Sequence, residues 1–99
     1  MSKLSNATHQ YLAAITTILK QHGIQQCCLF GSRTLGTERP GSDIDLCIMD
    51  DIDIVTLNAI DIDLEDLLLP VKVDLTKWSS IDNPDLKDHI NRVGYALNL

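Results

Sequence analysis

Two short segments at a fixed spacing constrain this chain more than any other feature. One apolar run ends at Gly31-Ser32, and after ten further residues a second apolar run begins at Asp43 and Asp45. Glycine at the end of a buried strand allows a tight turn and a close backbone approach. Residues i and i+2 of a strand point to the same face, so Asp43 and Asp45 are predicted to converge on one side of a sheet. The spacing therefore predicts a carboxylate pair beside a glycine turn.

Hydrophobic periodicity predicts a single α+β domain over residues 1–99, in the order α-β-β-α-β-α. Residues 52–69 alternate briefly like a strand, but their length and their helical stripe of leucine and isoleucine favour a helix that ends at Pro70. Ser5 or Asn6 is expected to cap the first helix and Gly23 to end it, and Asn83-Pro84-Asp85 is typical of a helix start. The predicted elements are helices over residues 6–22 and 52–69 and from residue 83 onward, a helical turn over residues 32–35, and strands over residues 27–30, 43–49 and 71–75.

Carboxylate oxygens at Asp43 and Asp45 suit Mg²⁺, and shared carboxylates can hold two ions about 4 Å apart. A third carboxylate is expected on a neighbouring strand, and Asp74 fits because it faces away from the apolar side chains around it. A charge on such a strand needs a partner, so Asp74 is predicted as a metal ligand that helps to deprotonate an acceptor hydroxyl. The alternative is a simple ion pair between Asp74 and Lys72.

The same Asp-x-Asp pattern occurs twice more, at Asp51/Asp53 and at Asp61/Asp63. Asp51 and Asp53 lie where a strand gives way to a helix, so helix capping explains them. Asp61 and Asp63 fall on a predicted helix, where residues i and i+2 diverge. Only the pair at Asp43 and Asp45 combines a strand with a preceding glycine turn.

Backbone N–H groups at Gly31 and the Ser32 hydroxyl are candidate donors to phosphate oxygens. Arg33 and Arg39 flank this turn and either could clamp a triphosphate, although each could equally be a solvated loop residue. Ser42, directly before the carboxylate pair, completes the predicted nucleotide-binding residues. His9, His22 and His89 share no ligand spacing and are predicted as surface or helix-end residues.

Composition narrows the function classes. The net charge of −6 disfavours a standing interface with bulk nucleic acid. No apolar run approaches the roughly 18 residues of a membrane span, and the N-terminus lacks the apolar core of a signal peptide, so a cytoplasmic protein is expected. Cys27, Cys28 and Cys47 are predicted to be buried reduced thiols.

The combination of Gly31-Ser32, ten intervening residues and Asp43-x-Asp45, within LFGSRTLGTERPGSDIDLCI, resembles the signature of the minimal nucleotidyltransferases of the DNA polymerase β-like superfamily. The resemblance extends over nearly the whole chain and includes Asp74 in VKVDLT. It implies a small mixed sheet flanked by helices, two Mg²⁺ ions held by Asp43, Asp45 and Asp74, and a nucleoside triphosphate held by Gly31 and Ser32.

The resemblance also implies a partner. Chains of this family are commonly encoded beside a helical protein of the HEPN class, and in toxin–antitoxin pairs the nucleotidyltransferase is an antitoxin that transfers AMP from ATP to a tyrosine of the toxin. Protein AMPylation in a hetero-oligomer is therefore the expected function. Two alternatives remain open at this point: neutralisation of the partner by binding alone, and nucleotidyl transfer to a small molecule.

Overall fold

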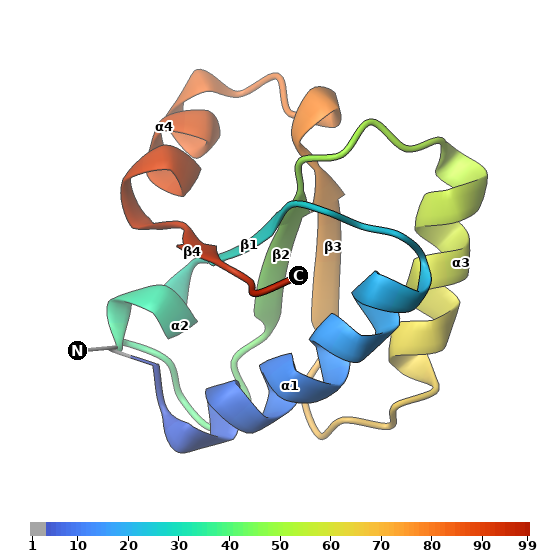
Figure 1. The fold of residues 1–99 in the computed structure, drawn as a ribbon. Helices are drawn as coiled ribbons and strands as arrows, with labels where there is room; N and C mark the ends of the chain where they lie inside the picture. Colours follow the sequence, from blue (N-terminus) through green and yellow to red (C-terminus); the bar gives the residue numbers. More distant parts are fainter. Residues whose placement is uncertain (1–3) are drawn as a thin grey trace.

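The computed structural model describes residues 4–99, which form a four-stranded mixed sheet with helices on both faces (Figure 1). The elements are α1 (Asn6–Gln21), β1 (Cys27–Phe30), α2 (Ser32–Leu35), β2 (Ile44–Ile48), α3 (Ile54–Glu65), β3 (Val73–Lys77), the 3₁₀ helix η1 (Trp78–Ser80), α4 (Pro84–Val93) and β4 (Tyr95–Ala96). The predicted fold class is confirmed. Residues 1–3 lie outside the described residues. They belong to the N-terminal segment that is predicted to lack the apolar core of a signal peptide.

The sheet has the strand order β3-β2-β1-β4. Strand β1 pairs antiparallel with both β2 and β4, whereas β2 and β3 are parallel. Parallel neighbours need a crossover connection, and α3 supplies it between β2 and β3. Within residues 4–99, no helix has the length and apolar character needed to cross a membrane.

Alternation along the strands divides the core between the two faces of the sheet. Ile44, Leu46 and Ile48 are fully buried in a cluster that includes residues of α1 and α3. Cys28 and Cys47 belong to a second cluster on the other face, which α4 covers. The face assignments predicted for β2 are thereby confirmed, and all three cysteines are buried and free, as predicted.

Helix-capping signals were predicted correctly. The Ser5 hydroxyl accepts a hydrogen bond of 3.1 Å from the Thr8 N–H at the start of α1. Gly23 follows the end of α1 in the left-handed region with φ of 75°. The Asn83 side chain accepts a hydrogen bond of 2.9 Å from the Asp85 N–H and caps α4.

Segment boundaries around α3 and β3 differ from the predictions. Helix α3 ends at Glu65 rather than at Pro70, and Leu68 then adopts φ of 53°. Leu68, expected on the buried stripe, is 87% exposed. Strand β3 begins at Val73 rather than Val71, and the short edge strand β4 was not predicted.

Candidate functional site

Gly31 forms a turn that no other residue can replace without strain. It ends β1 with φ of 84° and ψ of −157°, a backbone region that L side chains rarely occupy. A Cβ atom at this position would lie 2.5 Å from Oδ2 of Asp45. The bare glycine therefore lets the Asp45 carboxylate lie directly against the backbone of the turn.

Ser32 follows as the first residue of α2. The first N–H groups of a helix have no acceptor within the helix, so those of Ser32 and Arg33 are available to a ligand. In the described part of the chain the Ser32 hydroxyl makes no hydrogen bond, while its carbonyl accepts from the Thr37 N–H at 3.1 Å. The turn thus presents polar donors next to Asp45.

Strand register brings two of the predicted carboxylates together. Asp45 lies opposite Phe30 of β1 on one side and opposite Asp74 of β3 on the other. Partners in register point to the same face of a sheet, so Asp45 and Asp74 share the face covered by α4. Asp43 comes two residues before Asp45 and precedes the first residue of β2.

The electrostatics of Asp45 reflect this crowding. Burial raises the pKa of Asp45, and the negative charges of Asp74 and Asp43 raise it further, while His89 acts in the opposite direction. Like charges at close range favour the neutral carboxyl form, and a bound cation would reverse that preference. The site is therefore a half-buried acid flanked by two exposed ones.

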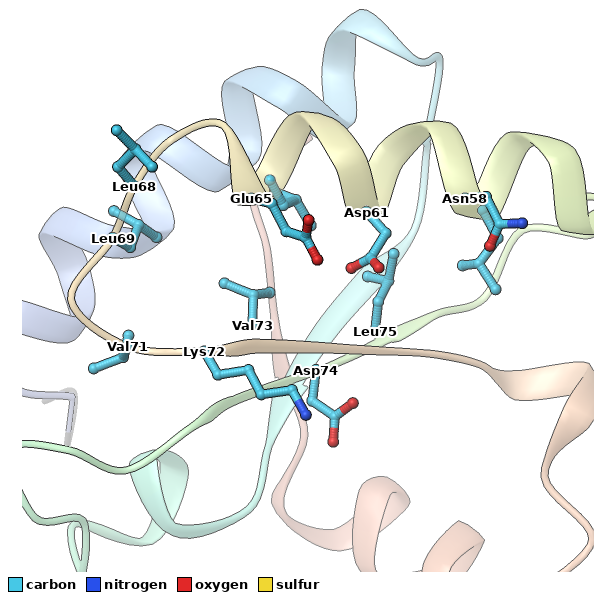
Figure 2. Close-up of a pocket in the computed structure, with 12 residues that line it drawn as sticks. Asn58, Asp61, Glu65, Leu68, Leu69, Val71, Lys72, Val73, Asp74 and Leu75 are labelled. Atoms are coloured by element: carbon cyan, nitrogen blue, oxygen red, sulfur yellow. The ribbon is translucent and has the colours of Figure 1, made fainter.

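Exposure corrects one step of the sequence argument about Asp74. Its side chain is exposed, so burial does not force it to have a partner. Figure 2 shows Asp74 and Lys72 projecting from the same side of β3, away from Val73 and Leu75. Within residues 4–99 no ion pair joins Lys72 to Asp74. The place of Asp74 in the site rests instead on its register with Asp45.

Arg33 has a different position from the one that a triphosphate clamp requires. Its side chain is 2% exposed, and its guanidinium lies over the Tyr11 ring at 5.5 Å. Nε and Nη2 donate to the Ser42 carbonyl at 3.2 and 2.9 Å, and Nη1 donates to the Thr8 hydroxyl at 2.7 Å. Arg33 thereby ties α1 to the loop that leads into β2, and its donors face protein acceptors.

The other two predicted nucleotide-binding residues lie in that loop. The Ser42 hydroxyl accepts a hydrogen bond of 2.9 Å from the Arg39 N–H, and the Ser42 N–H donates to the Arg39 carbonyl at 2.9 Å. These bonds close a turn just before Asp43. The Arg39 side chain is exposed, which leaves its charge in contact with solvent.

His89 of α4 was missed as a site residue. Its ring lies edge-on to Phe30, with 6.2 Å between ring centroids, and its charge lowers the pKa of the neighbouring Asp45. Periodicity could have indicated it, because His89 directly precedes the buried Ile90 and lies three residues after Leu86. His89 therefore faces the carboxylates from the helix that covers them.

The two other Asp-x-Asp pairs lie at the start of α3 and along it, as predicted. Asp53 caps α3, and its Oδ1 accepts a hydrogen bond of 2.8 Å from the Thr56 N–H. Asp61 and Asp63 lie on α3, and Asp63 Oδ2 is 2.7 Å from Nε2 of His22. Neither pair lies in a strand of the described residues.

The candidate site fits a divalent cation by donor chemistry but is not preassembled. Carboxylate oxygens are hard ligands of the kind that Mg²⁺ prefers. Across residues 4–99, no three acidic, histidine or cysteine side chains are already placed to hold one metal ion. A metal held by all three carboxylates would require these side chains to move closer together.

A mixed sheet with carboxylates on two adjacent strands beside a glycine turn defines the class of nucleotidyltransferases with a polymerase β-like fold. The chain belongs to the polymerase beta nucleotidyltransferase family, whose model matches residues 13–97. No curated protein resembles the chain closely enough in sequence to count as a match.

Solved structures resemble this chain over most of its length. A chain of a toxin–antitoxin complex with AMP-PNP is 26% identical, with a TM-score of 0.71, over 88% of this chain and 72% of that chain. A chain assigned as a minimal nucleotidyltransferase is 24% identical, with a TM-score of 0.73, over 96% and 95% of the two chains. A chain of a complex between AMPylated Shewanella oneidensis HEPN toxin and MNT antitoxin is 22% identical, with a TM-score of 0.63, over 91% of this chain and 71% of that chain. The last two likenesses concern the fold alone.

Proposed function

We propose that this chain is a Mg²⁺-dependent nucleotidyltransferase that transfers AMP from ATP to a hydroxyl, that of a tyrosine, on a helical partner protein of the HEPN class. It would thereby act as the antitoxin of a toxin–antitoxin pair. The observation that carries the proposal is the register of Asp45 with Asp74 next to Gly31. The similarity to a toxin–antitoxin chain crystallised with AMP-PNP supports the choice of an adenine nucleotide.

Each site residue has a part in this reaction. Asp43, Asp45 and Asp74 would hold two Mg²⁺ ions, and Gly31 and Ser32 would donate to the triphosphate oxygens. Bound Mg²⁺ neutralises phosphate charge and makes the acceptor hydroxyl easier to deprotonate. Arg39, exposed in the loop, is the remaining arginine that could pair with the triphosphate.

Bond changes follow the pattern of in-line nucleotidyl transfer. The acceptor oxygen forms a bond to the α-phosphorus, and the bond from that phosphorus to the bridging oxygen of the β-phosphate breaks. Pyrophosphate leaves with the bonding electrons. Asp74 accepts the proton of the acceptor hydroxyl, so that atoms and charge balance.

Labelled ATP tests this proposal. Purified chain is incubated with Mg²⁺, ATP labelled at the α-phosphate and the soluble protein of the source cells, and label on protein is measured. We expect Asp43→Asn to reduce transfer by about 100-fold or more, because a metal ligand is lost. Asp51→Asn is the matched control, since Asp51 is also the first acid of an Asp-Ile-Asp triplet, and it should leave transfer unchanged. Absence of label with both Mg²⁺ and Mn²⁺ would refute the proposal.

Neutralisation by binding alone is the second candidate function. It is favoured by the similarity to a chain that was crystallised in a toxin–antitoxin complex. The double substitution of Asp43 and Asp45 by alanine separates the two functions. If the variant still neutralises its partner as well as the original chain does, binding is sufficient and transfer is not the neutralising step.

A further inference from the structure

A groove between a helix and an edge strand lies away from the glycine turn. It has a volume of about 510 Å³ and runs between α3 and β3. Figure 2 shows Asp61 and Glu65 of α3 on one side of it, with Val73 and Leu75 of β3 pointing toward α3. Strand β3 pairs only with β2 in residues 4–99, so the other edge of β3 is open beside this groove.

We infer that this groove docks a basic, apolar segment of the acceptor protein and leads that segment to Asp74. The inference rests on the proposed transfer to a protein acceptor and names the surface that would recognise it. Asp74 belongs to the strand that lines the groove, and its carboxylate projects from the opposite side of β3, toward the carboxylate site (Figure 2). A segment lying along the open edge of β3 would therefore pass the residue that accepts the hydroxyl proton.

One exposed aliphatic side chain that lines the groove, and another beside it on the same face of α3, support a protein segment as the occupant. Ile54 lies on the same face of α3 as Asn58, Asp61 and Glu65 by helical spacing, and it is 59% exposed. Leu68 lines the far end and is 87% exposed. A surface helix normally turns polar residues outward, so exposed aliphatic residues along a groove indicate a contact surface.

The backbone of Leu68 adds to this argument. Leu68 is the only non-glycine residue with positive φ in residues 4–99. A leucine in the left-handed region is strained, and such strain clusters at functional sites. The strained backbone holds the apolar side chain of Leu68 in solvent at the rim of the groove.

Charge identifies the chemistry of the segment. Asp61 and Glu65 face the groove from α3, whereas the side chains of Lys72 and Asp74 project from the opposite side of β3 (Figure 2). A second copy of this chain, which carries a net charge of −6, would bring acid against acid. Nucleic acid is disfavoured for the same reason. A segment with leucine-like side chains flanked by Lys or Arg complements both the walls and the charge.

Paired variants test the docking surface. Leu68→Asn removes the apolar contact, and asparagine tolerates positive φ, so the variant should fold at least as stably as the original chain. Val55→Asn makes the same change at a 72% exposed residue of α3 that does not line the groove. With the acceptor protein purified from the labelling assay, we expect Leu68→Asn to raise the KM for that acceptor about tenfold. The kcat and the KM for ATP should remain unchanged, as should all constants of Val55→Asn.

A model peptide gives a readout that does not depend on transfer. An amphipathic helical peptide of leucine and lysine should shift the amide NMR signals of α3 and β3 in the original chain and in Val55→Asn. The shifts should be weakened in Leu68→Asn, and a peptide with glutamate in place of lysine should produce none. Equal binding to both variants, or shifts confined to other elements, would overturn the docking surface.

The two proposals can fail separately. If no protein acquires label but the peptide binds in the groove as described, protein adenylylation is wrong and the docking surface stands. If labelling occurs and Leu68→Asn leaves the acceptor KM unchanged, the docking surface is wrong and the transfer function stands.

Discussion

Gly31 and Asp45 share a space that cannot hold side chains from both residues. Because a Cβ at Gly31 would meet Oδ2 of Asp45 at 2.5 Å and the backbone there has φ of 84°, we expect Gly31→Ala to destabilise the protein by about 1–3 kcal/mol. The same change should abolish transfer, because Asp45 must move. Gly41→Ala is the control, since a Cβ at Gly41 would meet nothing within 4 Å, and it should be neutral within about 0.5 kcal/mol. Urea unfolding of both variants measures the difference, and equal losses would contradict the steric explanation.

Asp45 is a residue at which stability and activity oppose each other. Its pKa is raised in the folded state, so the folded protein binds this proton more tightly than the unfolded chain does. Stability from this group is therefore fully present at low pH and is lost as pH rises through the raised pKa. In the absence of metal, we expect Asp45→Asn to be more stable than the original chain at neutral pH, by on the order of 1 kcal/mol, and to lack transfer activity.

Thermal unfolding at several pH values, with EDTA present, tests the Asp45 prediction. The stability difference between Asp45→Asn and the original chain should shrink toward acidic pH, where Asp45 is protonated in both states. If Asp45→Asn loses as much stability between acidic and neutral pH as the original chain does, another group is responsible for the pH dependence.

The sequence predicts the acids of the candidate site but not every neighbour. Asp43 and Asp45 were separated from the two decoy pairs by strand placement, which needs only local periodicity. The burial of Arg33 depends on Thr8, 25 residues away, and no local pattern encodes that contact. His89 reaches the site only because α4 packs across β1.

At the scale of elements, Arg33 acts on the loop between α2 and β2. Its guanidinium bonds to the carbonyl of Ser42 and the hydroxyl of Thr8, so we expect Arg33→Lys to destabilise the protein by about 2–4 kcal/mol. Arg39→Lys, at an exposed residue of the same loop, should change stability by less than about 0.5 kcal/mol.

Denaturant unfolding combined with nucleotide kinetics distinguishes the two roles considered for Arg33. Loss of stability in Arg33→Lys, with the KM for ATP changed no more than in Arg39→Lys, supports the anchoring role. An unchanged stability together with a raised KM for ATP would instead support the clamp that the sequence suggested.

Short-range sequence signals predict most of the helices and strands, and the predictions differ from the structure where contacts between distant residues determine the conformation. Ser5, Gly23 and Asn83 marked helix ends correctly because capping is a short-range effect. The sequence does not predict strand β4, because its two residues are too few to show an alternating pattern and they pair only with the distant strand β1. Helix α3 stops before Pro70 because the chain must turn at Leu68 to enter β3.

For the whole molecule, Mg²⁺ should act as a stabilising ligand. A cation that binds only the folded state and relieves repulsion among the carboxylates should add about 1.4 kcal/mol at ten times its dissociation constant. We expect the unfolding temperature to rise with MgCl₂ in the original chain and in Asp51→Asn, but not in a chain with both Asp43 and Asp45 changed to asparagine. Scanning calorimetry measures this, and equal increases in all three would exclude a metal at this site.

The architecture was more predictable than the surfaces. The order of helices and strands and the two-faced pattern of β2 follow from periodicity. The parallel pairing of β2 with β3, which places Asp74 opposite Asp45, required the packing of α3. The groove beside α3 depends on a chain reversal at Leu68, where the backbone has a positive φ. This conformation is unfavourable for leucine, so the residue type does not predict the reversal.

The crossover through α3 divides the proposed metal ligands between two parts of one chain. Asp43 and Asp45 precede α3, and Asp74 follows it. A chain cut in the connection after α3 would yield two fragments, neither of which holds a complete set of carboxylates. Transfer by a mixture of the two would then report their reassociation, which makes this small domain a natural starting point for a split reporter of protein proximity.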